Sequence, residues 1–254
     1  RTAREAYEKA YAAEVPMVDL AISPYGCELA MSGVDWYVQH AFYYTTDGLK
    51  KHDAPPSSFC QMPWWKDQKA LSDYATGLGR MLNGMKRHVK TLLVDPATSI
   101  WVLNREQKKS QEEALSAVMN SLMRYGCDFY VADPQLLAKA SVKRQDGSTV
   151  LMLKGEAYES VVLPNMNNIE DCAFKVLRRY AEEGGLLVAA GGIPIYNVQK
   201  EQSAQWFAAA FGSGKDNLVH TDAEGAGRAI AQRMTNEVWK TEEEGLPEGV
   251  YTVT

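Results

Sequence analysis

Apolar and polar positions in the second half of the chain alternate between two spacings. Short apolar runs bounded by Pro or Gly, such as residues 161–163 and 186–190, are typical of buried strands. Between them, apolar residues recur every three or four positions, which is typical of helices packed on a sheet. The pattern predicts strands at 89–94, 128–132, 161–163, 186–190 and 217–220, and helices at 107–125, 134–140, 169–183, 202–211 and 223–236.

Strands that alternate with helices favour a parallel sheet, because each crossover places a helix on one of its faces. We therefore predict an α/β fold, a three-layer sandwich with a mostly parallel sheet, either flavodoxin-like or class I glutamine-amidotransferase-like. One exception interrupts the alternation, since Asp146-Gly147 predicts a hairpin within residues 142–153.

The first part of the chain has a different pattern. We expect a helix at residues 2–13, a strand at 34–38 and a long helix at 67–90. Gly77, Gly79 and Gly84 weaken that long helix by about 1 kcal/mol each relative to Ala, so we expect close packing beside them. A domain boundary is predicted between residues 88 and 89, giving domains of 1–88 and 89–254.

An aromatic loop (residues 41–65) follows the predicted strand 34–38 and is too long to be a simple connection. His40 stands at the end of that strand, where α/β folds build their sites, although a buried structural histidine is an equal alternative. The loop carries flat side chains with polar handles, which suit sugar rings: Tyr43, Tyr44, Trp64 and Trp65. A loop pinned by Trp64 and Trp65 is the structural alternative.

The usual signatures of catalysis are missing. The Gly-rich turns at Gly191-Gly192 and 212–214 do not have the spacing of a phosphate-binding loop. No Ser or Cys follows the strand 186–190 as a nucleophile would, and we interpret Cys127 and Cys172 as core residues. Glu28 and Asp35 do not lie at a strand's carboxyl end, so no pair of catalytic carboxylates is predicted.

The composition narrows the classes of partner. Hydrophobic residues make up 46% of the chain and the net charge is -5, which is ordinary for a globular protein and provides no basic surface for nucleic acid. No apolar run reaches the roughly 18 residues of a membrane span. We predict no metal and no cofactor, because the cysteines are scattered and lack histidine partners.

Several strings of this sequence occur together in one known family. They are GVDWYVQHAFYYTTDG, Pro55-Pro56, QMPWW, DYATGLGRML and TLLVDPATSIW. Together they resemble glycoside hydrolase family 106, the α-L-rhamnosidase-like proteins, by motif over residues 26–105 and by pattern alone over 106–235. The junction between the barrel and the middle domain of family 42 β-galactosidases is similar more loosely.

The resemblance implies that residues 1–88 are the end of a (β/α)8 barrel, with its aromatic loop and a connecting helix, and that an amidotransferase-like α/β domain follows. Asp35 departs from the asparagine that is usual in the family's last barrel strand. The resemblance further implies that one group of residues faces a carbohydrate substrate: His40, Tyr43, Tyr44, Gln61 and Trp64.

The family's catalytic carboxylates belong to earlier barrel strands, so the resemblance implies a fragment of a polysaccharide-acting hydrolase that is inactive by itself, with unknown catalytic residues. Two alternatives stay open. One is a non-catalytic α/β module for oligomerisation or carbohydrate binding, and the other is a flavodoxin-like ligand binder or a relative of the amidotransferases. We expect a soluble protein, secreted or periplasmic if a signal peptide precedes Arg1.

Overall fold

A computed structural model of the protein describes residues 43–48, 57, 59–82, 88–198 and 204–234. The described residues belong to two compact units, one ending at Arg87 and the other beginning at His88. The predicted helix at 2–13 and the predicted strand at 34–38 lie outside the described residues. No helix in the part of the chain that the structure describes is long and apolar enough to cross a membrane.

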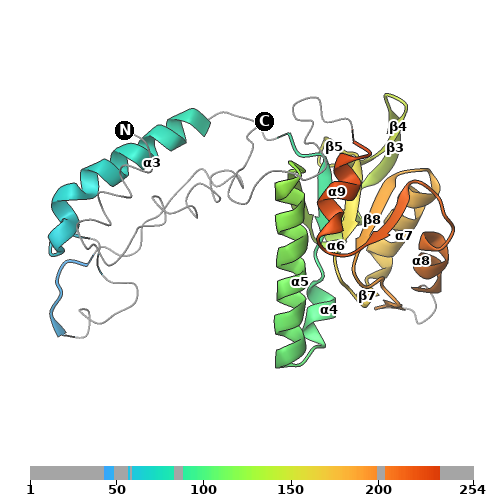
Figure 1. The fold of residues 1–254 in the computed structure, drawn as a ribbon, viewed down its shortest axis with the longest axis horizontal. Coiled ribbons are helices and arrows are strands. Elements are labelled where there is room, and N and C mark those ends of the chain that lie inside the picture. Colours follow the sequence, from blue (N-terminus) through green and yellow to red (C-terminus); the bar gives the residue numbers. More distant parts are fainter. Residues whose placement is uncertain (1–42, 49–56, 58, 83–87, 199–203, 235–254) are drawn as a thin grey trace. The chain divides into compact units, whose positions relative to one another are not determined.

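The second unit is a three-layer α/β sandwich built on a five-stranded parallel sheet, as predicted (Figure 1). Its strands are β1 (Thr91–Val94), β2 (Phe129–Ala132), β6 (Ser160–Leu163), β8 (Leu186–Ala190) and β10 (Leu218–Thr221). Apolar runs such as Leu186–Ala190 form central strands because both of their faces are covered by helices.

The spatial order of the strands is β10-β8-β6-β1-β2. Counted along the chain, this is the flavodoxin-like order, in which the direction of winding reverses between β1 and β6. Ligands of such folds bind beyond the carboxyl ends of the strands, next to that reversal. We call this side of the sheet the carboxyl edge.

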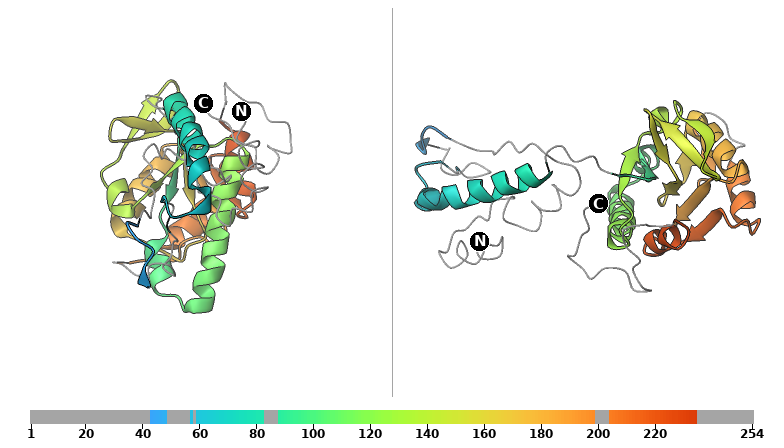
Figure 2. Two further views of the ribbon diagram at one scale, coloured as in Figure 1. Left: turned by 90° about the vertical axis from the view of Figure 1, so that its left-hand side faces the viewer. Right: turned by 90° about the horizontal axis from the view of Figure 1, so that it is seen from above.

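Helices cover both faces of the sheet (Figures 1 and 2). They are α4 (Ala97–Trp101), α5 (Arg105–Arg124), α6 (Pro134–Leu137), α7 (Asp171–Glu182), α8 (Ala204–Phe211) and α9 (Gly225–Ala231). The apolar faces of α5 and α9 pack on one side of the sheet, against Leu93 and Val162 among others. At their crossing, Gly227 leaves no room for a Cβ beside the Ser121 carbonyl.

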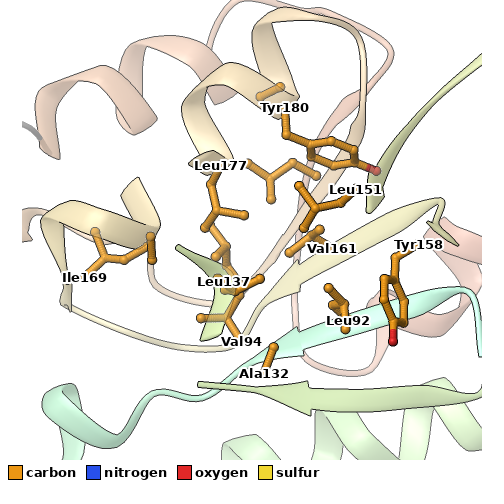
Figure 3. Packing of buried hydrophobic residues seen from close by; sticks show 14 of the residues in the cluster. Leu92, Val94, Ala132, Leu137, Leu151, Tyr158, Val161, Ile169, Leu177 and Tyr180 are labelled. Atoms are coloured by element: carbon orange, nitrogen blue, oxygen red, sulfur yellow. The ribbon is translucent and has the colours of Figure 1, made fainter. Parts of the chain in front are cut away.

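The larger core lies on the opposite face, between the sheet and α6, α7 and α8. Figure 3 shows Leu92 of β1 and Val161 of β6 facing side chains of α7, including Leu177 and Tyr180. Tyr180 is fully buried, and its hydroxyl donates to the Glu159 carbonyl at 2.7 Å, so its one polar atom is satisfied.

A three-stranded antiparallel sheet adds to the same core. It consists of β3 (Ser141–Gln145), β4 (Ser148–Leu153) and β5 (Glu156–Tyr158). The hairpin predicted at Asp146-Gly147 is confirmed, with φ angles of 50° and 84° at these residues. The sequence analysis did not predict β5, nor the short parallel pair of β7 (Asn168–Ile169) and β9 (Tyr196–Asn197).

The first unit contributes a 3-10 turn, η2 (Pro63–Asp67), and α3 (Gln68–Leu82). The prediction that this helix extends to residue 90 is wrong, because His88–Lys90 are not helical. Lys90 is already part of the second unit, because its backbone carbonyl accepts a hydrogen bond from Glu159 N at 2.8 Å. No described atom lies within 4 Å of the Cβ position of Gly77 or Gly79, and Gly84 lies outside the described residues, so the expected close packing stays a prediction.

Candidate functional site

Five polar side chains follow the strands of the parallel sheet at the carboxyl edge. They are Asp95 after β1, Asp133 after β2, Asn165 and Asn168 after β6, and Asp222 after β10. A side chain at this position in an α/β fold is a first candidate for catalysis or binding. The hydrogen bonds of these five residues therefore decide what the carboxyl edge can do.

Asn165 joins three elements through an amide bridge, which we define as Gln111, Asn165 and the backbone N–H of Gly192. Asn165 Nδ2 donates to Gln111 Oε1 at 2.8 Å, and Asn165 Oδ1 accepts from Gly192 N at 2.8 Å. In return, Gln111 Nε2 donates to the backbone carbonyl of Asn165. Because Gln111 is buried on α5, both of its amide atoms are satisfied without a ligand.

Glycines make this approach possible. Gly191 has a φ of 106°, a region that L side chains rarely adopt. A Cβ on Gly192 would lie 2.5 Å from Asn165 Oδ1, so the amide bridge fits only against a glycine. The turn after β8 is thus shaped to receive the side chain of Asn165.

A second set of hydrogen bonds centres on Ser99 of α4 and Asn168 of β7. Ser99 Oγ donates to Asn168 Oδ1 at 2.9 Å and accepts from the backbone N–H groups of Asn167 and Asn168 at 3.1 and 3.2 Å. Thr98 Oγ1 also donates to Asn168 Oδ1 at 2.9 Å. Ser99 is buried, so this hydroxyl is a structural anchor and not an exposed nucleophile.

The three aspartates each accept hydrogen bonds from the helix or turn that follows them. Asp95 Oδ1 accepts from Ala97 N at 3.0 Å, and Asp222 Oδ1 accepts from Gly225 N at 2.7 Å. Asp133 Oδ1 accepts from Gln135 N at 2.7 Å as the N-cap of α6. Among the described residues, no group of three His, Cys, Asp or Glu side chains could hold a metal ion.

The thiols differ in their surroundings. Cys127 is buried against α9, and burial raises its pKa from 9.0 to about 12. A thiol held protonated in this way is a poor nucleophile, which supports the interpretation of Cys127 as a core residue. Cys172 is half-buried at the start of α7, and Cys60 of the first unit is exposed.

In the first unit, Gln61 holds together the two ends of the aromatic loop. Gln61 Nε2 donates to the carbonyls of Tyr43 and Tyr44 at 2.8 and 3.0 Å. Gln61 Oε1 is buried and has no hydrogen-bond partner among the described residues. Ser57 adds a further tie, because its Oγ accepts from Tyr43 N at 3.3 Å and from Phe59 N at 3.2 Å.

The structure brings some of the predicted binding residues together and leaves another outside its description. Tyr43, Tyr44 and Gln61 adjoin one another through the hydrogen bonds of Gln61. Tyr44 is 97% exposed, whereas Trp64 is half-buried in η2. His40 lies outside the described residues. The ring of Trp65 meets Phe59 edge to face at 5.2 Å, which fits the alternative that Trp65 pins the loop.

The sequence pattern did not mark Gln111, Asn165 or Ser99 as site residues. One signal was present, because three asparagines occur within residues 165–168, directly after a buried strand. Their partners were not recognisable, since Gln111 and Asn165 are 54 positions apart and Gly192 lies 27 positions beyond Asn165.

Comparisons with known proteins give a distant similarity to a solved structure. No family model matches the chain, and no curated protein matches its sequence. Among solved structures, the chain is similar to a β-galactosidase from Rahnella sp. R3, with 15% identity and a TM-score of 0.37. The match covers 54% of this chain and 18% of that one, so the chain spans less than a fifth of the β-galactosidase. A similarity this distant does not establish what the chain does.

Proposed function

We propose that this chain is part of a glycoside hydrolase of the α-L-rhamnosidase-like kind and is catalytically silent by itself. The observation that carries the proposal is that the five polar side chains after the strands of the parallel sheet all serve structural hydrogen bonds. A retaining or inverting glycosidase needs two carboxyl groups about 5 to 9.5 Å apart across the sugar. The three aspartates of the carboxyl edge are instead committed to backbone N–H groups.

The aromatic loop would contribute one wall of a sugar site that the complete enzyme forms. Gln61 Oε1 offers a buried acceptor to a sugar hydroxyl, and its amide already holds the carbonyls of Tyr43 and Tyr44. A buried oxygen without a donor costs about 1–3 kcal/mol, and a bound hydroxyl would recover that cost. The resemblance to the rhamnosidase-like family would add His40 and Trp64 to the same wall.

The assay of the chain with aryl α-L-rhamnosides and aryl β-galactosides tests this proposal. We expect no release of the aryl group above the rate in buffer. Robust turnover of either substrate would overturn the claim of silence. Titration with L-rhamnose and galactose, followed by tryptophan fluorescence, tests the sugar wall, and Gln61→Leu should remove any saturable signal.

A second candidate is an assembly module that acts through the carboxyl edge. Three of the five segments that follow the strands at this edge, residues 96–104, 164–169 and 191–198, contain no Asp, Glu, Lys, Arg or His in a chain that is 23% charged. They also expose large apolar side chains: Trp101, Val102, Ile195, Tyr196 and Val198. Depletion of charge together with exposed aromatic residues is typical of the core of a protein interface.

Light scattering coupled to size-exclusion chromatography tests this second candidate separately from the first proposal. A module that assembles through the carboxyl edge should elute as an oligomer, and Trp101→Ser with Ile195→Ser should return it to a monomer. A monomer across the full concentration range would count against assembly and would leave the first proposal unaffected.

A further inference from the structure

β2 is one of the two outer strands of the parallel sheet, and its outer edge pairs with no other strand among the described residues. Edge strands present unpaired backbone groups, and proteins usually protect them by covering, twisting or charging the edge. β2 is short, and two of its four side chains are exposed, Tyr130 at 41% and Val131 at 53%. We propose that this edge binds an extended peptide segment whose apolar centre is flanked by Lys or Arg.

The direction of the backbone identifies the groups that would bind. Asp95 N donates to the Ala132 carbonyl at 3.0 Å, so the backbone of Ala132 faces β1. Because successive residues of a strand point their N–H and C=O groups to opposite sides, the backbone of Val131 points away from β1. Neither group of Val131 has a backbone partner among the described residues. Val131 therefore offers one donor and one acceptor to an added strand.

The N–H of Phe129 also points away from β1, but it already has a hydrogen-bond partner. Phe129 N donates to Asp128 Oδ1 at 3.0 Å, so the beginning of β2 is capped by its own preceding side chain. The edge is thus open at Val131 and closed at the N–H of Phe129. A peptide would dock with its central hydrogen bonds on Val131.

The other outer strand of the described sheet, β10, is closed at its start in the same way. Gly191 N donates to the Thr221 carbonyl at 2.9 Å, so Leu218 is among the residues of β10 whose backbone points outward. Leu218 N already donates to the Lys215 carbonyl at 3.0 Å, and its side chain is buried. The start of β10 is closed by its own turn, while the backbone of His220 points outward and has no backbone partner among the described residues. The open position carries Val131 in β2 and a histidine in β10, so an apolar peptide centre is favoured at β2.

The charges beside β2 indicate whether a second copy of the chain or a different peptide would pair with its outer edge. Asp128 and Asp133 bracket β2. Suppose that two β2 strands pair antiparallel with Val131 of one copy opposite Val131 of the other. Asp128 of each copy would then lie one position away from Asp133 of the other copy. A parallel pairing would place identical aspartates side by side. Like charges across strands are unfavourable, whereas Lys or Arg at both ends of a peptide would be attracted.

The side chains of β2 indicate the centre of the peptide. Tyr130 and Val131 lie on opposite faces of the strand, and each is partly exposed. An added strand with β-branched residues at alternating positions would cover both faces, because cross-strand pairs of aromatic and β-branched side chains are favourable.

The test uses the 254-residue chain and a fluorescent peptide of alternating valine and threonine with lysines at both ends. We expect saturable binding by fluorescence anisotropy, weakened by salt, and about tenfold weaker binding when glutamates replace the lysines. Absence of saturable binding of the lysine peptide would overturn the proposal. So would a dimer in light scattering that Val131→Pro dissolves, because the edge would then serve a second copy.

Two variants assign the binding to this edge. Val131→Pro removes an N–H outside the ladder with β1, so the chain should fold and lose at least about tenfold in affinity, whereas Val131→Thr should bind within about twofold of the parent. Asp128→Asn with Asp133→Asn keeps both side-chain acceptors and should abolish the preference for lysine over glutamate. Unchanged affinity of a folded Val131→Pro chain, or an unchanged preference in the asparagine variant, would contradict the proposal.

Discussion

Two glutamines show how differently the two units use the same side chain. Gln111 in the α/β unit exchanges hydrogen bonds with Asn165 through both of its amide atoms. Gln61 in the aromatic loop donates twice to backbone carbonyls but leaves its buried Oε1 without a partner among the described residues. A saturated amide stabilises a fold, whereas a half-satisfied one has capacity for a ligand. The amide bridge at the carboxyl edge is therefore structural, whereas binding by the loop is what we propose.

The largest expected effect is from breaking the amide bridge. Asn165→Ala should lower the free energy of unfolding by about 3 kcal/mol, because it leaves Gln111 Oε1 and the Gly192 N–H without partners. Urea unfolding measures this loss. Asn167→Ala is the matched control: its exposed side chain takes part in no described hydrogen bond, so its effect should stay within about 0.5 kcal/mol. Equal effects of the two variants would contradict the structural role of Asn165.

A smaller loss is expected when the space for the bridge is filled. Gly192→Ala places a Cβ 2.5 Å from Asn165 Oδ1, and we expect a loss of about 2 kcal/mol in the free energy of unfolding. Gly79→Ala, in α3, meets no described atom within 4 Å and should instead stabilise the chain by about 0.5–1 kcal/mol. Stabilisation by Gly192→Ala would show that the turn after β8 has room to relax.

The buried thiol of Cys127 makes the free energy of unfolding depend on pH in the alkaline range. Burial raises the pKa of Cys127 from 9.0 to about 12, so the unfolded thiol loses its proton at a pH where the folded thiol keeps it. This contribution to stability is complete below pH 9 and is lost as pH rises from 9 to about 12. The expected slope from this group is about 1.4 kcal/mol per pH unit in that window.

Urea unfolding at several alkaline pH values measures the slope. Cys127→Ala should be less stable at neutral pH but should lose less stability between pH 9 and 11 than the parent. The fully buried Tyr180, whose pKa burial also raises, adds to the alkaline loss in both proteins. Parallel curves for parent and variant would contradict the assigned burial of Cys127.

The smallest effect is expected at Gln61. Gln61→Leu removes two hydrogen bonds to partly exposed carbonyls and also removes an unsatisfied oxygen, so these changes partly cancel. We expect a loss of at most about 1 kcal/mol by urea unfolding, against about 2 kcal/mol for Gln111→Leu. A larger loss for Gln61→Leu than for Gln111→Leu would reverse the comparison between the units.

Local sequence signals predicted the parts of the fold that depend on near neighbours. The apolar run 186–190, ended by two glycines, became β8 with the same limits, and Asp146-Gly147 formed the expected hairpin. The pair β7 and β9 was not predictable, because two-residue strands contain no period. Five-residue α4 is likewise too short to show an amphipathic repeat.

The candidate site was predictable only in part, because local sequence signals mark polar residues but not the distant residues that they contact. Aromatic and amide side chains of the loop stand out in the sequence, and Gln61 does contact Tyr43 and Tyr44. The polar character of Asn165 and Asn168 after a buried strand was equally visible. That these asparagines are structural depends on Gln111, Gly192 and Ser99, which only the strand order and the crossovers bring to them.

The most direct test of the central claim is a double-mutant cycle between Gln111 and Asn165. The free energy of unfolding would be measured by urea for the parent, Gln111→Leu, Asn165→Ala and the double variant. A closed structural bridge predicts a coupling energy of about 1–2 kcal/mol, because either single change already disrupts what the other contributes. Additivity within about 0.5 kcal/mol would contradict the account and leave the carboxyl edge available as a ligand site.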